Sequence, residues 1–324
     1  MQKQNNIKDE LIKDSETPEQ KPVEEVTVVA KGKGSAKINK KNVFEILDSE
    51  DNSNRLQVDS YIARKLRKAS NKKRPKDEFF NKTNSEGNII EVQGVSKYYL
   101  SGNIVSRVLK NVSLEIKKGE FVMIFGKSGG GKSTLLNLIS GLDRPSRGNV
   151  IVCDTNLPYL SDNKLTLFRR AHISFIFQNY NLLQNLNGFD NVKTGGYLQK
   201  DPAKKLNIDD LFKEFGLEEI KDKYPSQMSG GQQQRISILR ALAKNSEIIF
   251  ADEPTAALDE QTTSLVLSYL FDINKKYNTT IVMVTHNPHI ANIADKIVYV
   301  KNGKIKDVKI NNNPLHPSTL NWEN

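Results

Sequence analysis

A glycine-rich segment at residues 126–133, GKSGGGKS, constrains the fold of this chain more than any other feature of the sequence. It fits the pattern G-x-x-x-x-G-K-[ST], and it lies between an apolar run of buried-strand type, EFVMIF, and a helical stretch, TLLNLIS. A glycine-rich turn at this place lets successive backbone N–H groups and the helix N-terminus point at phosphate oxygens. The segment therefore predicts a strand, a phosphate-binding loop and a helix in immediate succession.

This loop supplies the groups that a bound nucleoside triphosphate needs. The Lys132 ammonium neutralises the β- and γ-phosphates, and the Ser133 hydroxyl can bind Mg²⁺. The alternative is a glycine-rich strand-to-helix turn without a ligand. The residues of this segment that we predict to bind nucleotide are Gly126, Lys127, Ser128, Gly129, Gly130, Gly131, Lys132, Ser133 and Thr134.

From residue 89 onward, short β-type runs alternate with amphipathic helical stretches. Runs of buried-strand type that are separated by helices predict an α/β fold with a mostly parallel sheet covered on both faces. The expected strands are 89–95, 112–116, 120–125, 173–177, 248–251, 280–284 and 297–300, and residues 132–140 are expected to be helical.

Two adjacent carboxylates end the apolar run at 248–251. Because a parallel sheet brings the carboxyl ends of its strands to one edge, Asp252 is expected near the phosphate loop, where it would bind Mg²⁺ directly or through water. Glu253 is one residue further and would face the other way if the strand geometry persists, so it could polarise an attacking water as general base. The alternative is an Asp-Glu pair that merely ends a strand at the surface.

A second candidate anion site lies at residues 229–235, SGGQQQR, which open an amphipathic helix. A small hydroxyl residue followed by two glycines at a helix N-terminus can bind an anion. Two phosphate-type sites for one nucleotide make sense if Ser229, Gly230 and Gly231 serve the nucleotide held by another copy of the chain. An ordinary N-cap is the alternative.

Composition excludes several classes of protein. No stretch approaches the roughly 20 uninterrupted apolar residues of a membrane-spanning helix, and no apolar segment follows the charged N-terminus as in a signal peptide. Cys153 is the single cysteine, which excludes an intrachain disulfide framework and a cysteine-based zinc site. We therefore expect a chain that is neither integral to a membrane nor secreted, in a reducing cytosol.

Residues 1–88 are expected to form a mostly disordered extension, because they carry little apolar patterning. Two short segments, 42–47 and 61–66, could form helical turns that need a partner. Between residues 55 and 76 there are nine basic residues and one acidic residue. Such a cluster indicates a solvated tail, a contact with anionic lipid, or, less favoured, a contact with nucleic acid.

The complete set of motifs resembles the nucleotide-binding subunit of an ATP-binding cassette (ABC) transporter over about residues 89–308. GKSGGGKS resembles the Walker A loop, MSGGQ the signature, IIFADE the Walker B strand and AALD the D-loop. The resemblance implies an ABC domain over 89–310 with a parallel core sheet, an antiparallel β subdomain and a helical signature subdomain, followed by a short polar tail at 311–324.

Roles for further residues follow from this resemblance. Gln178 matches the Q-loop and would contact Mg²⁺ and the γ-phosphate, and His286 matches the switch histidine and would act in catalysis beside Glu253. Tyr99 matches the aromatic residue that stacks on adenine, with Tyr98 as the competing assignment. Gln232, in the signature, and Asp259, in the D-loop, would complete the nucleotide site. ATP and Mg²⁺ are the implied cofactors.

The stretches around Gln178 are similar to the macrolide-exporter and lipoprotein-release type of ABC ATPase. At four positions the residue of this chain differs from the one that is usual in that type: Lys127, Gly130, Met228 and Ala256. None of these departures removes a catalytic group. The region around Gln184 and Gly188 is where such subunits dock on their permease.

The resemblance implies that two copies close head to tail around two Mg-ATP and drive a separate membrane permease. The expected partners are a second copy and an integral permease, and the expected location is the cytoplasmic face of the membrane. An ABC-type protein that acts on ribosomes or nucleic acid is the alternative. It is disfavoured because only one phosphate loop and one signature occur, with no coiled-coil insertion between Ser133 and Ser229.

Overall fold

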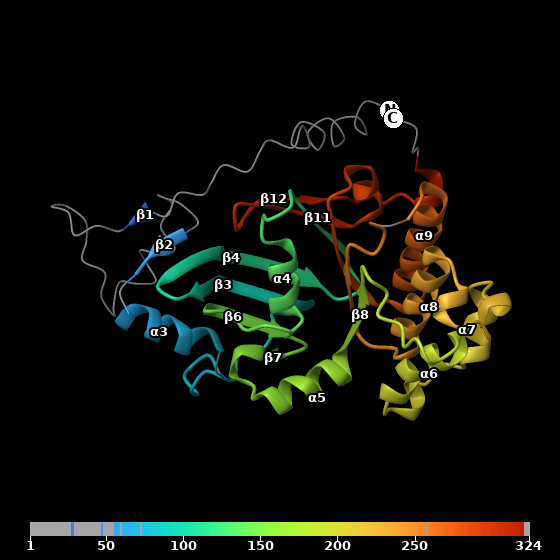
Figure 1. Cartoon of the computed structure of the whole chain (residues 1–324), viewed down its shortest axis with the longest axis horizontal. Coiled ribbons are helices and arrows are strands. Elements are labelled where there is room, and N and C mark those ends of the chain that lie inside the picture. Colours follow the sequence, from blue (N-terminus) through green and yellow to red (C-terminus); the bar gives the residue numbers. More distant parts are fainter. Residues whose placement is uncertain are drawn as a thin grey trace. The chain divides into compact units, whose positions relative to one another are not determined.

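The computed structural model describes residues 27–28, 47, 55–58, 60–71, 73–256 and 258–320 (Figure 1). These residues form two compact units. The first unit runs up to Ile116 and includes Gly126–Leu165 and Tyr299–Asp307. The second unit contains Lys117–Phe125, Thr166–Val298 and the residues from Val308 onward. Helix α5 (Asp162–His172) begins in the first unit and continues into the second.

The sheet of the first unit has the strand order β1-β2-β4-β3-β6-β7. Two long strands at its centre, β3 (Asn88–Ser101) and β4 (Ile104–Lys117), form a hairpin, and β3 pairs antiparallel with β6 (Arg147–Val152). The remaining strands are short: β1 (Thr27–Val28), β2 (Arg55–Gln57) and β7 (Thr155–Asn156). Apart from the parallel β1–β2 pair, this is the antiparallel β subdomain that the family resemblance implies.

The sheet of the second unit has the strand order β12-β11-β5-β10-β9-β8. Its parallel part consists of β5 (Phe121–Phe125), β10 (Thr280–Thr285), β9 (Ile248–Asp252) and β8 (Ile173–Phe177). Every residue of β5 and β10 is buried. Central parallel strands are covered on both faces, which explains why these two read as continuous apolar runs instead of alternating ones.

Two further strands, β11 (Lys296–Lys301) and β12 (Lys304–Ile310), complete this sheet beyond β5. The helices of the second unit include the signature helix α8 (Gly230–Ala243) and α9 (Glu260–Tyr277). Shorter helices α6 (Gly188–Leu198) and α7 (Ile208–Glu214) pack against α8. The α/β fold with a mostly parallel core sheet and a helical signature subdomain is confirmed.

The expected disorder of residues 1–88 is wrong for part of that segment. Helix α3 (Ser60–Asn71) is longer than the helical turn expected at 61–66, and β2 pairs antiparallel with β4. The helix is held because Ile62, Ala63 and Leu66 are buried against the first unit's sheet, a partner that its own short sequence does not reveal. Most of residues 1–54 lie outside the described part of the chain.

The C-terminal tail also differs from a simple polar extension. A 3-10 turn, η6 (Pro317–Thr319), packs against α9, and the Asn311 amide donates hydrogen bonds to the carbonyl oxygens of Asn292 and Ala294 at 3.0 Å. The described residues therefore extend the second unit to residue 320. Among the described residues, no helix is long and apolar enough to cross a membrane.

Candidate nucleotide site

Four of the predicted site segments follow strands whose carboxyl ends share one row of the parallel sheet. In this row Phe177 pairs with Asp252, Asp252 with Val284, and Val284 with Ile124. Gln178 and Glu253 come directly after their row residues, and His286 and the phosphate loop each begin two residues after theirs. The register thus carries four distant segments of the sequence to the same edge of the sheet, as expected for the carboxyl ends of parallel strands.

The backbone turns sharply at Glu253. Its φ is 48°, in the left-handed region that a residue with a side chain seldom adopts, and its N–H donates a 3.0 Å hydrogen bond to the carbonyl oxygen of Val284. Strand geometry therefore ends at Asp252, so the condition on which Glu253 was expected to face the other way, a strand that persists through it, is not met. The turn, and not alternation, directs this side chain. A glutamate at positive φ is uncommon, and strained backbone of this kind clusters at active sites.

The turn brings Glu253 next to His286. The distance between Glu253 Oε1 and His286 Nδ1 is 3.3 Å. The carboxylate is 22% exposed and the imidazole 58% exposed, so a water molecule can reach both groups. A partly buried carboxylate beside an imidazole is a pair able to accept a proton from water and to hold it in place.

Two of the three oxygen ligands proposed for Mg²⁺ lie at the ends of neighbouring strands. Asp252 is half-buried at the end of β9, and Gln178 is exposed directly after β8. The Ser133 hydroxyl is in the first unit, at the start of α4 (Lys132–Ile139). A carboxylate, an amide oxygen and a hydroxyl are hard ligands of the kind that Mg²⁺ prefers, so the chemistry of this set fits the ion.

The phosphate loop has a backbone that requires glycine at both ends. Gly126 has a φ of 155°, and a Cβ built there would lie 2.1 Å from the carbonyl oxygen of Val300. Gly131, with a φ of 107°, caps α4, and a Cβ there would lie 2.9 Å from Leu109 Cδ2. The two ends of the loop thus pack closely against neighbouring residues, and within the loop the Gly130 N–H donates a 3.1 Å hydrogen bond to the Lys127 carbonyl, which gives the curled backbone of a phosphate-binding loop.

Lys132 is buried and spans the phosphate loop. Its ammonium donates hydrogen bonds to the carbonyl oxygens of Gly126 at 2.7 Å and of Lys127 at 3.1 Å. The loop is anchored from outside by the turn between β11 and β12, where the Gly303 N–H donates a 3.0 Å hydrogen bond to the Gly130 carbonyl. This anchor could not be predicted from the sequence, because nothing local to residue 303 indicates where its turn will lie.

The structure distinguishes the two candidate adenine-stacking residues. Tyr98 is completely buried, whereas Tyr99 is 42% exposed. The Tyr99 hydroxyl donates a 2.8 Å hydrogen bond to Asp143 Oδ2, and the Lys97 ammonium lies 4.8 Å from the centre of the Tyr99 ring. Burial, followed by the hydrogen bond to Asp143, raises the pKa of Tyr99, which keeps the phenol neutral. Of these two tyrosines, only Tyr99 is exposed to a ligand.

Asp143 is a site residue that the sequence analysis did not single out. Its carboxylate accepts hydrogen bonds from Tyr99 and, at 2.7 Å, from the Lys97 ammonium, which also donates to the Arg144 carbonyl at 2.7 Å. The Lys97 side chain is only 2% exposed. A charged residue within the loop GLDRPSRG, after the predicted helix, was the available signal. Its carboxylate also accepts a 2.7 Å hydrogen bond from the N–H of the next residue, Arg144, but Lys97 and Tyr99 are more than 40 residues away in the sequence.

The signature segment is capped within its own chain. Ser229 Oγ accepts a 3.3 Å hydrogen bond from the Gln232 N–H, and the Gln232 side chain accepts a 2.9 Å bond from the Ser229 N–H. This capping box is the ordinary N-cap that the sequence left as an alternative. The hydroxyl of Ser229 is exposed at the start of a 14-residue helix, and Gly230 and Gly231 are partly exposed beside it.

Asp259 caps α9 in a similar way. Its carboxylate accepts hydrogen bonds from the Thr262 N–H at 2.9 Å and the Thr262 hydroxyl at 2.8 Å. Both bonds lower the pKa of Asp259, the one from the Thr262 N–H having the larger effect, and they keep the carboxylate ionised. The side chain is exposed, and its described contacts serve the helix.

Comparison with known proteins places these motifs in one family. The family model described as "ABC transporter" matches residues 109–256. A putative ABC transporter ATP-binding protein of Mycoplasma genitalium, MG065, is 49% identical over 235 residues, which are 72% of this chain and 50% of that protein. The bacitracin export ATP-binding protein BceA of Halalkalibacterium halodurans is 42% identical, over 67% of this chain and 87% of its own length.

A solved structure supports the same assignment. The dimeric ATP-binding cassette MJ0796, in a post-hydrolysis state bound to ADP and Pi, is 37% identical and has a TM-score of 0.62. The match covers 68% of this chain and 98% of that one. The chain spans about half the length of the first two curated relatives, 50% and 52%. From the motifs, the register and these similarities together, this chain belongs to the ABC transporter family and contains its ATP-binding domain.

Proposed function

We propose that this chain binds and hydrolyses Mg-ATP as the ATPase subunit of an ABC transporter of the exporter and lipoprotein-release type. The observation that carries this proposal is the shared register row, from which Gln178, Glu253, His286 and the phosphate loop all emerge. The stability of the sheet does not require these four polar groups to lie at one edge, whereas nucleotide binding does. The bacitracin export relative supports the exporter type.

The proposed site binds the nucleotide through two kinds of contact, one to the phosphates and one to the adenine. The loop N–H groups, the N-terminus of α4 and the Lys132 ammonium hold the phosphates, while the Tyr99 ring stacks on the adenine. Mg²⁺, when bound by Ser133, Gln178 and Asp252, neutralises charge on the β- and γ-phosphates. Lys127 adds a positive charge in the loop at a position that holds proline in most members of this type.

Hydrolysis needs a base at the edge of the sheet. Glu253 accepts a proton from the attacking water, and His286, 3.3 Å away, orients that carboxylate and the water toward the γ-phosphate. Gln178 follows the next strand of the same row and senses whether the γ-phosphate is present. This is positioning and electrostatics without a covalent intermediate on the protein.

The second half of each site comes from another copy of the chain. Ser229, Gly230 and Gly231 lie exposed at a helix N-terminus, which is favourable for an anion, and Gln232 and Asp259 lie on the same unit. The dimer of the MJ0796 cassette supports a head-to-tail pair here. Because Asp259 is ionised and exposed, it is available to the neighbouring copy.

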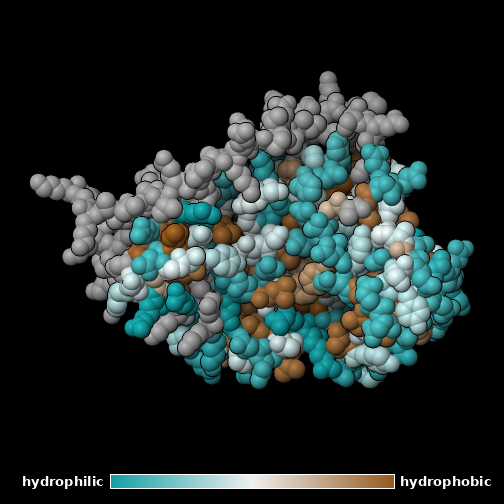
Figure 2. All heavy atoms as spheres, in the orientation of Figure 1, coloured by the Kyte–Doolittle hydropathy of each residue, from teal (hydrophilic) through white to brown (hydrophobic). Residues whose placement is uncertain are grey.

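A permease is the proposed membrane partner, and the second unit offers an exposed apolar surface for it. Leu183 is 48% exposed after the Q-loop, and Tyr197 and Leu198, at the end of α6, are 64% and 43% exposed. Leu198 also lines two open hollows, one of about 390 Å³ at the end of α5 and one of about 270 Å³ beside β8. On the face drawn in Figure 2, brown hydrophobic residues are exposed in patches between teal hydrophilic residues. The chain would then be peripheral, at the cytoplasmic face of the membrane.

Contact of the basic cluster with anionic lipid is a further part of this proposal. Arg64 and Arg67 of α3 are exposed, as is Arg55 in β2. Because the apolar side of α3 is used against the protein, this contact would be electrostatic, without insertion of the helix. The nucleic-acid alternative gains no support from the similarities.

The deciding experiment compares the full chain with its Glu253→Gln variant. We expect the variant to bind Mg-ATP and to form a dimer that wild type forms only transiently, with turnover reduced by about a hundredfold or more. Normal turnover in the variant would contradict the assignment of the base. Recovery of an integral membrane protein with the ATP-locked variant in mild detergent supports the transporter assignment, whereas recovery of ribosomes would overturn it.

A further inference from the structure

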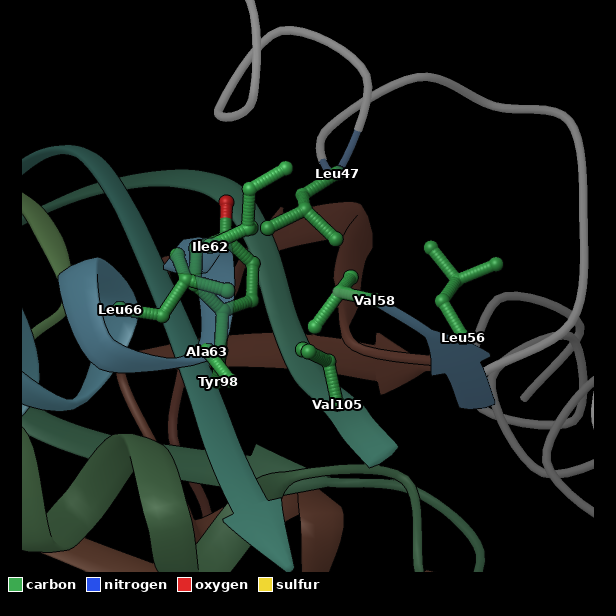
Figure 3. Close-up of a cluster of buried hydrophobic side chains, with 8 residues drawn as sticks. All are labelled: Leu47, Leu56, Val58, Ile62, Ala63, Leu66, Tyr98 and Val105. Atoms are coloured by element: carbon green, nitrogen blue, oxygen red, sulfur yellow. The ribbon is translucent and has the colours of Figure 1, made fainter. Parts of the chain in front are cut away.

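An N-terminal segment with no counterpart among the family motifs packs against the strand that carries Tyr99. The Tyr98 cluster consists of eight buried apolar residues: Leu47, Leu56, Val58, Ile62, Ala63, Leu66, Tyr98 and Val105. In Figure 3 the α3 side chains gather at Tyr98 on β3, and Val58 lies beside Val105 on β4. Tyr98, Leu66 and Val105 are completely buried, so this is a packed core and not a loose contact.

Backbone hydrogen bonds tie the same segment to the tip of the β3–β4 hairpin. Leu56 of β2 pairs with Val105, and the Val58 N–H donates a 2.9 Å hydrogen bond to the carbonyl of Asn103 in the hairpin turn. The Asn103 side chain in turn donates to Ser60 Oγ, at the start of α3, at 3.3 Å. The tip that follows Tyr99 by four residues is therefore held by β2 and α3.

The segment after α3 is attached at a second place. The Arg74 N–H donates a 2.9 Å hydrogen bond to the Pro158 carbonyl, and the Asn156 side chain donates to the Phe79 carbonyl at 2.9 Å. Asn84 and Asp154 exchange two backbone-to-side-chain bonds of 3.1 and 2.8 Å. Helix α3 is thus fixed at both ends to the first unit's sheet.

Alternation along β3 links this packing to the adenine contact. Because successive side chains of a strand point to opposite faces, Tyr98 faces the cluster while Lys97 and Tyr99 share the other face, where both bond to Asp143. Tyr99 is thus held from one side by Asp143 and supported from the other through the backbone of its neighbour. Its ring stays partly exposed between these two supports.

We propose that β2 and α3 position Tyr99 for the adenine base, with Ile62 and Leu66 as positioning residues that act through Tyr98. This inference rests on the proposed nucleotide binding and extends it to the N-terminal segment. Shortening Ile62 or Leu66 opens a cavity under Tyr98 into which β3 relaxes, and such relaxation displaces the residue next to it. The effect should fall more on the base than on the phosphates, because Gly126 and Lys127, which bond to Lys132, and Gly303, which bonds to the Gly130 carbonyl, are not members of the Tyr98 cluster.

The test measures two dissociation constants for each full-length variant in the Glu253→Gln background, one for Mg-ATP and one for Mg-tripolyphosphate. Tyr99→Ala should weaken ATP binding about tenfold, the effect of one lost stacking contact. We expect Ile62→Ala and Leu66→Ala to weaken ATP binding by about threefold or more, with tripolyphosphate unchanged. Ile62→Ala added to Tyr99→Ala should cause no further loss, since both act on one contact.

Two controls separate positioning from damage to the fold. Ile151→Ala removes an equally buried side chain from the same sheet, outside the Tyr98 cluster, and should leave the ratio of the two constants unchanged. Ile62→Val removes one methylene and should cause a smaller loss of ATP affinity, again with tripolyphosphate unchanged. This variant keeps the inference testable if Ile62→Ala does not fold.

Equal losses for both ligands, or a full effect of Ile62→Ala in the Tyr99→Ala background, would overturn the inference. The inference would also be overturned if Tyr99→Ala weakened ATP binding while Ile62→Ala and Leu66→Ala left it unchanged. In that case the assignment of the nucleotide site would still stand. If Tyr99→Ala itself binds ATP normally, the adenine contact in the proposed function is wrong and the inference fails with it.

Discussion

Gln234 Nε2 donates a 2.7 Å hydrogen bond to the carbonyl oxygen of Pro254, which joins the buried side of the signature helix to the turn that holds Glu253. Gln234 is completely buried in the middle of α8. The signature helix and the Glu253 turn, the two segments of this unit that we propose to contribute to ATP hydrolysis, are therefore linked by one side chain. A shift of α8 reaches the proposed base through this bond.

We predict that Gln234→Met, which conserves volume, lowers kcat more than ATP affinity. It removes the donor to a buried carbonyl and should lower the free energy of unfolding by about 1–2 kcal/mol. Gln233→Met is the matched control, because that side chain bonds to Pro225 and Met228 and not to the Glu253 turn. Steady-state kinetics and urea denaturation of both variants check this. Equal kcat values for the two variants would contradict the link.

His286→Ala is predicted to lower kcat by about a hundredfold, with little change in ATP affinity. The imidazole lies 3.3 Å from Glu253 Oε1 and is 58% exposed, so its removal leaves the base without its neighbour but creates no core cavity. His316→Ala is the control, since that ring lies against Phe271 and Asp272. A kcat for His286→Ala equal to that of the control would show that the carboxylate acts without the imidazole.

Gly126→Ala should destabilise the chain much more than Gly129→Ala. Both glycines have positive φ, but a Cβ at Gly126 would meet the Val300 carbonyl oxygen at 2.1 Å, whereas Gly129 has open space around it. We expect a loss of about 1 kcal/mol for Gly129→Ala from backbone strain alone and of about 3 kcal/mol or more for Gly126→Ala. Thermal unfolding of the two variants measures the difference, and similar melting temperatures would contradict the close packing of the loop.

Asp143→Ala is predicted to lower the free energy of unfolding by about 3 kcal/mol, because it leaves the buried Lys97 ammonium without its counter-charge. The double variant Lys97→Met with Asp143→Leu should recover to within about 1 kcal/mol of wild type, since it removes both charges. Denaturant titrations of the single and double variants decide between these outcomes. A double variant as unstable as Asp143→Ala would mean that shape, and not charge, governs this site.

Because the pKa of Lys244 is lowered in the folded chain, we predict that the free energy of unfolding rises with pH. It is buried, its ammonium donates to the carbonyl oxygens of Arg169 and Ile173, and burial, followed by the charges of Arg169 and Arg170, lowers its pKa from 10.5 to about 8. Between these two values the unfolded chain holds the proton that the folded chain has lost. The free energy of unfolding should therefore rise with pH in this window, by at most about 3 kcal/mol.

Comparison with Lys244→Met isolates this effect from other groups that titrate at high pH. Denaturant titrations at several pH values between 7.5 and 10.5 should show the difference between wild type and variant changing in favour of wild type as pH rises. A difference that stays constant over the range would contradict the lowered pKa.

Much of the second unit's sheet could be predicted from the sequence. The run at residues 173–177 coincides with β8, and those at 248–251 and 280–284 lie within β9 and β10. Strands of this kind must be apolar along their length to be buried on both faces, so their composition identifies them without knowledge of their neighbours.

The N-terminal segment is where sequence-based prediction was wrong. Within residues 55–71 the apolar positions are few, and they become a core only against Tyr98 and Val105, which lie in other strands. Helix formation by a short segment depends on such tertiary contacts more than on its own propensity. A count of apolar residues in the segment alone therefore predicts disorder.

The sequence by itself determined the features that depend on neighbours along the chain: the phosphate loop, the buried strands, and the caps at Ser229 and Asp259. Tertiary structure decided which residues meet. The register row that gathers Gln178, Glu253 and His286, the left-handed turn at Glu253, the burial of Tyr98 beside an exposed Tyr99, and the contacts of Asp143 all arise from pairing and burial between distant segments. Those contacts depend on which surfaces are buried together, and local sequence patterns do not encode that.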